Sequence, residues 1–162
     1  MIWLFKILIV YDSTSGNTEK MAHAVAEGAG KVKGTKVIVK KVKRAVPDDL
    51  LEADGIILGS PTYFGQMSTE MKGFVDRSLK VYGKLDGKVG AAFTSSGGMV
   101  SGAETTLLSI IQAMLIHGMI VMGRSKGMHY GAAATGTPDS KAVDNCRDLG
   151  YKTASIVARL AK

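Results

Sequence analysis

Five short apolar stretches recur along the chain, separated by loops and by segments in which apolar positions follow helical spacing. The first, 7–11, is a continuous apolar and β-branched run, which is typical of a strand buried on both faces of a sheet. Four further strands are predicted at residues 37–39, 53–59, 89–94 and 119–122. The spacing of apolar residues also predicts a helix over 18–29, which Gly30 ends.

Three more helices are predicted from the same spacing. One begins after the third strand and turns Leu79 inward, and the second covers about residues 103–115. Thr137 suits the cap of the last helix, and Pro138 suits its first turn. Strands that alternate with helices through short loops predict an α/β fold. We expect a doubly wound parallel sheet of five strands with helices on both faces, in a single domain over residues 1–162.

Cysteine and histidine are sparse in this sequence. The single cysteine, Cys146, excludes an internal disulfide and a redox motif of paired cysteines. His23, His117 and His129 are scattered, and none has a second ligand at the spacing that a metal site needs. The sequence therefore predicts no metal.

The N-terminal residues give no indication of export. They are apolar through Val10 but include Lys6, and they lack the basic region and cleavage site of a signal peptide. No apolar stretch approaches the roughly 20 uninterrupted residues of a membrane span. We expect a cytoplasmic protein that does not insert into a membrane.

The formal net charge is +7, and its excess lies in one segment, 31–44, which holds seven basic residues and no acidic one. One interpretation is an edge strand that lysines protect against pairing with other sheets. The other is a docking face for an acidic partner, or non-specific affinity for nucleic acid. No aromatic residue interrupts the basic run, which argues against a surface that stacks single-stranded bases. Nucleic acid is therefore not the expected partner.

In doubly wound sheets, ligands bind beyond the carboxyl ends of the strands, where the strand order reverses. That rule selects three loops, all rich in Ser, Thr, Gly or Asn and poor in charge. The first places hydroxyls, an amide and a glycine at the start of a helix, where backbone N–H groups and the helix dipole favour a phosphate. Its residues are Ser13, Thr14, Ser15, Gly16, Asn17 and Thr18.

Other phosphate-binding motifs are absent. No Lys-Ser or Lys-Thr pair follows Gly16, and Gly28, Gly30 and Gly34 do not have the spacing of a dinucleotide fingerprint. These features argue against ATP, GTP and a Rossmann-bound dinucleotide. The alternative is that the polar residues of the loop only cap the helix, but capping requires one such residue rather than five around a glycine.

The segment 9–22 resembles the flavodoxin signature along its whole length: an apolar pair, an aromatic residue, a Ser/Thr-rich loop, Thr18, and Ala22 one helical turn later. In flavodoxins this loop surrounds the FMN phosphate. The resemblance implies a sheet of order 2-1-3-4-5, FMN as cofactor, and a phosphate site formed by residues 13–18.

The second loop resembles that of the flavodoxin-like NAD(P)H:quinone oxidoreductases, once named as tryptophan-repressor-binding proteins. The similarity is a Pro-Thr-aromatic-Phe-Gly run that precedes a Met-rich helix. In that family the loop lies along the flavin ring, which implies a cofactor-binding role here for Pro61, Thr62, Tyr63, Phe64 and Gly65. The alternative is that Tyr63 and Phe64 are core aromatics, but they follow the carboxyl end of a strand, where ligands bind.

The third loop follows the fourth predicted strand and is similar to the Gly-rich loop that approaches the flavin in the same family. Its predicted cofactor-binding residues are Ser95, Ser96, Gly97 and Gly98. The His-Gly-Met run at His117 also resembles that family, where the histidine reaches toward a flavin site. The resemblance makes His117 a candidate catalytic residue that could protonate a quinone oxygen. Trp3 is expected at the opposite end of the sheet, away from the flavin.

The chain also departs from the quinone oxidoreductases. The segments 43–53 and 123–136 are shorter than in that family, whose longer segments help to build a tetramer and its shared active site. The departures leave nicotinamide binding and a dimer or tetramer as open expectations.

Two redox functions are compatible with these features. The first is an electron carrier of the flavodoxin kind, which serves redox partner proteins. The second is an NAD(P)H:quinone oxidoreductase that makes two-electron reductions. The neutral loops and basic charge would repel anionic, fully reduced FMN only weakly, which favours the second slightly. A redox-inert regulatory or nucleic-acid-binding module is the third alternative, and it would leave the three polar loops unexplained.

Overall fold

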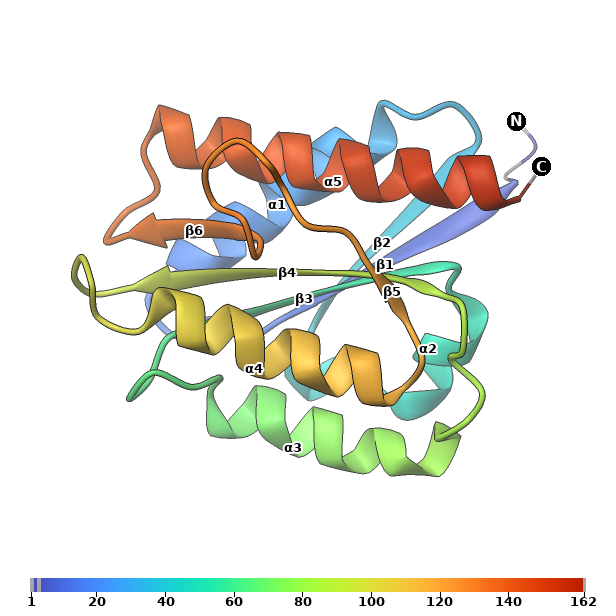
Figure 1. Cartoon of the computed structure of the whole chain (residues 1–162), viewed down its shortest axis with the longest axis horizontal. Coiled ribbons are helices and arrows are strands. Elements are labelled where there is room, and N and C mark those ends of the chain that lie inside the picture. The colour runs from blue at the N-terminus through green and yellow to red at the C-terminus, as the bar shows by residue number, and fades with distance from the viewer. Residues whose placement is uncertain (1, 3, 162) are drawn as a thin grey trace.

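The computed structural model describes residue 2 and residues 4–161, so the expectation for Trp3 lies outside the described residues. Strands and helices alternate along the chain (Figure 1), with two short 3₁₀ helices between them. The elements are β1 (Phe5–Tyr11), α1 (Asn17–Gly30), β2 (Thr35–Lys41), η1 (Val42–Arg44), α2 (Pro47–Glu52), β3 (Gly55–Pro61), α3 (Thr69–Arg77), η2 (Ser78–Val81), β4 (Val89–Ser96), α4 (Ala103–Ile116), β5 (Ile120–Val121), β6 (Ala132–Thr135) and α5 (Ser140–Leu160).

The strands form one parallel sheet in the order β2-β1-β3-β4-β5, which confirms the predicted fold class. The order reverses between β1 and β3, because β2 lies on one side of β1 and all later strands lie on the other. β1, β3 and β4 occupy the middle of the sheet and are buried along almost their whole length. Continuous apolar runs suit such central strands because both of their faces are covered.

Helices cover both faces of the sheet, and each face has its own core. α1 and α5 pack on one face together with Ile7, Ile9 and Phe93. α2, α3 and α4 pack on the other face with Leu8 and Leu58. Figure 1 shows these two helical layers above and below the strands. The alternation of odd and even positions of β1 between the two cores follows from the two-residue period of a strand.

The position beside β4 is divided between two strands, which the sequence did not predict. β5 has only two residues and pairs with Val89 and Gly90, whereas β6 pairs with Phe93–Ser96 further along β4. The chain leaves the sheet between them, over residues 122–131. The fifth predicted strand therefore lies where it was predicted, but it pairs with only part of β4.

Two local predictions were wrong. The last helix is capped by Asp139, whose carboxylate accepts a hydrogen bond from the Ala142 amide at 2.8 Å, and not by Thr137. Leu79, predicted to face inward, is 75% exposed. α3 ends at Arg77 and the chain tightens into η2 at Ser78, so the α-helical period that placed Leu79 inside ends two residues before it.

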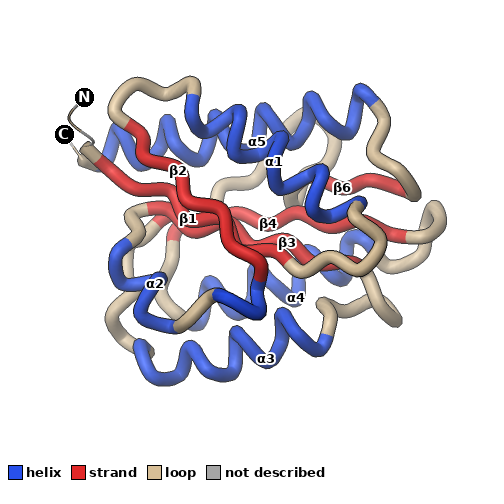
Figure 2. Tube along the Cα trace, turned by 180° about the vertical axis from the view of Figure 1, so that it is seen from behind, coloured by secondary structure: helices blue, strands red, loops and turns tan. Residues whose placement is uncertain are grey.

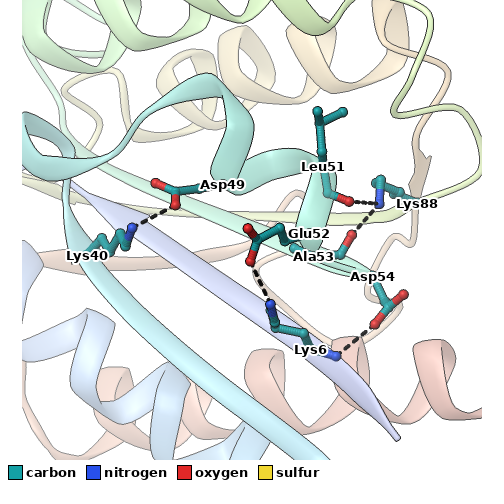
Figure 3. Close-up of polar contacts among 8 residues, drawn as sticks. All are labelled: Lys6, Lys40, Asp49, Leu51, Glu52, Ala53, Asp54 and Lys88. Carbon is teal, nitrogen blue, oxygen red and sulfur yellow. Dashed lines mark hydrogen bonds and ion pairs between the residues drawn. The ribbon is translucent and has the colours of Figure 1, made fainter.

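A network of charged side chains fixes the short helix α2 to the sheet. The Lys6 ammonium contacts Glu52 at 2.9 Å, and the Lys40 ammonium contacts Asp49 at 2.7 Å (Figure 3). Lys88 donates to backbone carbonyls near the end of α2. The segment between β2 and β3 is thus an anchored connection rather than a loose loop. None of the described helices is both long and apolar enough to cross a membrane.

Candidate functional site

The first loop leaves a set of backbone donors free at the start of α1. Gly16 has a left-handed backbone with φ of +94°, and no side chain caps the helix at this position. The Ser13 hydroxyl accepts hydrogen bonds from the Gly16 and Glu19 amides at 3.1 and 3.3 Å. Among the described residues, no acceptor is found for the amides of Thr14, Ser15, Asn17 and Thr18. Unpaired N–H groups at a helix N-terminus suit an anion.

Thr18 joins the first loop to the third. Its hydroxyl lies 2.8 Å from the Ser95 hydroxyl at the end of β4, and both side chains are buried. The side chain of Thr18 therefore faces the sheet, while its amide faces the loop. This pairing fixes the start of α1 against the neighbouring strand ends.

The second loop is a tight turn with an exposed aromatic tip. The backbones of Tyr63 and Gln66 exchange two hydrogen bonds of 3.0 Å, and Phe64 and Gly65 between them have φ of +51° and +72°. Positive φ at both central residues is uncommon for a bulky side chain such as Phe64. The Phe64 side chain is nevertheless fully exposed, so no packing against the described residues compensates for the strain. Such strain clusters at ligand-binding sites.

Further contacts hold the second loop beside the first and the third. The Tyr63 hydroxyl donates to the Thr14 hydroxyl at 3.1 Å. The Thr62 amide donates to the Ser95 carbonyl at 2.7 Å, and the Thr62 and Thr94 hydroxyls lie 2.8 Å apart. Pro61 ends β3 and is buried. All three loops therefore lie at one edge of the sheet, as the carboxyl ends of parallel strands require.

The third loop packs directly on the second. Gly102 has φ of +98°, and a Cβ added there would lie 2.6 Å from the Cα of Gly65, so the two backbones touch. Ser96 is buried and donates to the carbonyl of Gly98 at 2.9 Å, whereas a Cβ added at Gly97 would meet open space. Val100 has φ of +51° and, like Met99, is exposed at the tip.

The structure does not bring His117 to these loops. His117 follows α4, and its neighbour Gly118 accepts a hydrogen bond from Gly87, which precedes β4, so His117 lies at the amino edge. Its Nε2 is 2.7 Å from the Ser78 hydroxyl, which itself donates to the Val75 carbonyl. The Ser78 hydroxyl must then accept from His117, which leaves the buried Nδ1 without a partner among the described residues. Burial lowers the pKa of His117 below 6.5.

A groove behind the third loop was missed by the sequence reasoning. It has a volume of about 430 Å³ and lies between the third loop, the start of α4 and the segment before β6. Met128, with φ of +43°, and the exposed Tyr130 belong to its wall. The glycines at 127 and 131 could have indicated this groove, but β6 was not predicted, so nothing in the sequence placed them beside β4.

The donor set fits FMN. A phosphate monoester suits backbone amides and hydroxyls at the start of a helix, and an aromatic ring system suits the exposed apolar tips of the second and third loops. With the observed strand order, these loops define the class of flavodoxin-like redox proteins, which use FMN. His117 is outside this site, whereas all predicted residues of the three loops belong to the same edge: Ser13, Thr14, Ser15, Gly16, Asn17, Thr18, Pro61, Thr62, Tyr63, Phe64, Gly65, Ser95, Ser96, Gly97 and Gly98.

Comparison with known proteins defines the family. The family model "NADPH-dependent FMN reductase" matches residues 5–132, and the chain belongs to this family. A flavodoxin of Aquifex aeolicus is 42% identical, with 94% of this chain and 87% of the relative covered. An NAD(P)H dehydrogenase (quinone) of Archaeoglobus fulgidus is 36% identical, with 96% and 98% covered. The crystal structure of a flavodoxin, WrbA-like protein from Agrobacterium tumefaciens superposes with a TM-score of 0.82 at 28% identity, covering 96% and 98%.

One of these relatives differs from this chain in length. The alignment with the Archaeoglobus fulgidus protein extends over 189 positions, whereas this chain has 162 residues. That relative therefore carries segments that this chain lacks.

Proposed function

We propose that the chain acts as one FMN-binding domain over residues 1–162 and transfers electrons to or from a redox partner protein. The observation that carries the proposal is Phe64, a strained and fully exposed aromatic residue whose neighbour Tyr63 contacts the first loop. A strained aromatic residue without packing partners is best explained by a ligand with an apolar ring. The free amides of the first loop supply the matching phosphate site.

In this proposal the three loops divide the cofactor between them. The amides of Thr14, Ser15, Asn17 and Thr18 bind the phosphate as neutral donors, so no cation is needed for a monoester. The backbone of the second loop and Phe64 contact one side of the ring. Gly97 and Gly98 leave space for the backbone of the third loop to approach the ring edge. Bound FMN supplies reversible uptake and release of electrons.

A second candidate function is two-electron reduction of a quinone with NAD(P)H as donor. The neutral character of the three loops favours it, because no acidic side chain within residues 13–18, 61–65 or 95–98 would oppose the charge of fully reduced FMN. His117 could serve a flavin only in an assembly, since it lies at the opposite edge of its own sheet. A role for His117 therefore requires a dimer or tetramer. Both functions fit a cytoplasmic protein with a free, buried cysteine.

Anaerobic reductive titration of the FMN-loaded protein, followed by visible absorbance, tests the proposal. A carrier of single electrons accumulates one-electron-reduced flavin in the middle of the titration. Direct passage from oxidised to fully reduced flavin supports quinone reduction, and steady-state rates with NAD(P)H and a quinone are then measured. Failure to load FMN under any condition would contradict both functions.

A further inference from the structure

Two cations at the end of the edge strand β2 lie outside the proposed flavin site. In the basic segment 31–44, Lys40 pairs with Asp49 at 2.7 Å (Figure 3), and Lys41 lies 3.5 Å from Glu19. Lys43 and Arg44 are exposed and form no ion pair with any described residue. Exposed cations that have no ion pair in the described part of the chain are available to a partner.

Protection of an edge strand does not explain these two cations. β2 lies at an edge of the sheet (Figure 2), and Lys36 on it is suited to prevent pairing with another sheet. Lys43 and Arg44 lie beyond the strand, in η1 (Val42–Arg44), where no ladder of free backbone groups needs protection. Their charge therefore requires another explanation.

The two cations follow the end of β2 that borders the first loop. Lys41 is in register with Tyr11, the last residue of β1, and residues 12–18 follow it. The Tyr11 hydroxyl donates to Glu19 at 2.8 Å. Burial, together with the hydrogen bond to Glu19, raises the pKa of Tyr11 to about 12. Since η1 follows Lys41 directly, Lys43 and Arg44 lie near the carboxyl edge, where the flavin loops gather.

The same edge also exposes apolar side chains. Phe64, Met99 and Val100 stand out at the tips of the second and third loops, which touch through Gly65 and Gly102. An apolar centre beside a charged rim is the usual composition of a transient protein interface. Small phosphorylated ligands instead need polar groups that converge in a pocket. Cations spread along a strand end fit an extended acidic surface better.

We propose that Lys43 and Arg44 dock an acidic electron-transfer protein against the carboxyl edge, an inference that rests on the proposed function. The partner class is an acidic one-electron carrier, represented here by a protein whose redox centre is an iron–sulfur cluster. One electron leaves its reduced cluster, which becomes oxidised, and enters the FMN, which is reduced by one electron. No bond forms or breaks between the two proteins, and any proton comes from the solvent. The basic rim orients the partner so that its cluster faces the flavin.

The test uses a reduced plant-type [2Fe–2S] ferredoxin as probe. Its rate of electron transfer to the FMN-loaded protein is measured by stopped flow at several salt concentrations, and its affinity is measured by calorimetry with and without FMN. The variant Lys43→Gln/Arg44→Gln is compared with Lys33→Gln/Lys36→Gln, which removes the same charge. Residues 36 and 41 are roughly 16 Å apart at about 3.3 Å per residue, so the control pair lies about two Debye lengths away at physiological salt.

We expect Lys43→Gln/Arg44→Gln to slow the second-order rate about 3–10-fold at about 0.1–0.15 M salt, where the control pair is screened, and to flatten its salt dependence, since electrostatic steering acts on the on-rate. The control pair should stay within about twofold. Equal slowing by both pairs, or by neither, would overturn the docking site. The docking site would also be overturned if Lys43→Gln/Arg44→Gln weakened the binding of duplex DNA or of NADPH more than it weakened the binding of ferredoxin. If the protein takes up no FMN but still binds ferredoxin in a salt-sensitive way, the proposed function is refuted, whereas the docking site is not.

Discussion

Thr18 shows how one side chain can serve the site without touching the ligand. Its amide is among the free donors of the first loop, while its buried hydroxyl lies 2.8 Å from that of Ser95. Replacing Thr18 would leave the Ser95 hydroxyl unpaired in the interior, which costs about 1–3 kcal/mol of stability. Phosphate binding is therefore better tested with side chains at the surface of the loop.

The variant Ser15→Ala tests the phosphate site without removing the Thr14 hydroxyl that contacts Tyr63. Loss of the Ser15 hydroxyl beside the free amides should weaken FMN by up to about tenfold, the equivalent of roughly 1.4 kcal/mol. Riboflavin, which has no phosphate, should bind the variant and the native protein equally. Flavin fluorescence quenching measures both affinities, with Ser155→Ala on the surface of α5 as the control. An equal loss for the two flavins would mean that the loop does not bind the phosphate.

His117 predicts a pH dependence of stability. Burial lowers its pKa in the folded protein below 6.5, so at mildly acidic pH the unfolded chain binds the proton more readily. The free energy of unfolding should therefore fall as the pH drops below about 6.5. It should be constant above that range. Carboxylates titrate near 4 and contribute only at lower pH.

Thermal unfolding from pH 8 to 5.5 measures this effect. His117→Gln should remove most of the loss of stability in this range, because no imidazole is left to charge. His23→Gln, at an exposed histidine of α1, should retain it. Identical pH profiles for the native protein and His117→Gln would contradict the assignment.

At the scale of elements, the contact between α1 and α5 depends on two glycines. A Cβ added at Gly150 would lie 2.0 Å from the Val25 carbonyl oxygen, and one at Gly28 would lie 1.9 Å from that of Arg147. The two helices thus touch through their backbones, and α1 carries the first loop at its start. The packing of α5 therefore helps to fix the position of the phosphate site.

Gly150→Ala should destabilise the fold by about 1–3 kcal/mol, because the added methyl group meets backbone that cannot give way. Gly30→Ala is the matched control: it lies in α1, its added Cβ meets open space, and better helix propensity gives up to about 1 kcal/mol of stabilisation. Urea denaturation compares the two variants. Native stability in Gly150→Ala would show that the helices are not in backbone contact.

Most elements could be predicted from the sequence because their apolar periods are clear. β1 and β3 contain continuous apolar runs, at residues 7–11 and 56–58, and α1 has a regular helical face. β6 escaped prediction because Ala132–Thr135 contains neither a β-branched run nor an alternating pattern. α2 was missed since six residues are too few for a helical period to be visible. Both elements, β6 and α2, form because they pack against the rest of the sheet and not because their local sequence favours them.

At the scale of the whole molecule, topology explains which predicted site residues share one edge of the sheet and which one does not. The three loops were predicted correctly to share an edge, because the carboxyl ends of parallel strands do so. The same rule assigns His117, which precedes β5, to the amino edge. The resemblance to a family suggested a flavin role for it despite this geometry. Contacts such as those between Gly65 and Gly102 depend on loop conformation and could not be inferred from residue order.

An equilibrium titration of the flavin-free protein tests FMN binding at the carboxyl edge most directly. Flavin fluorescence is followed as FMN and riboflavin are added separately. We predict one FMN per chain, bound at least about tenfold more tightly than riboflavin, because only FMN engages the free amides of the first loop. Equal affinity for the two flavins, or no binding of either, would contradict the central claim.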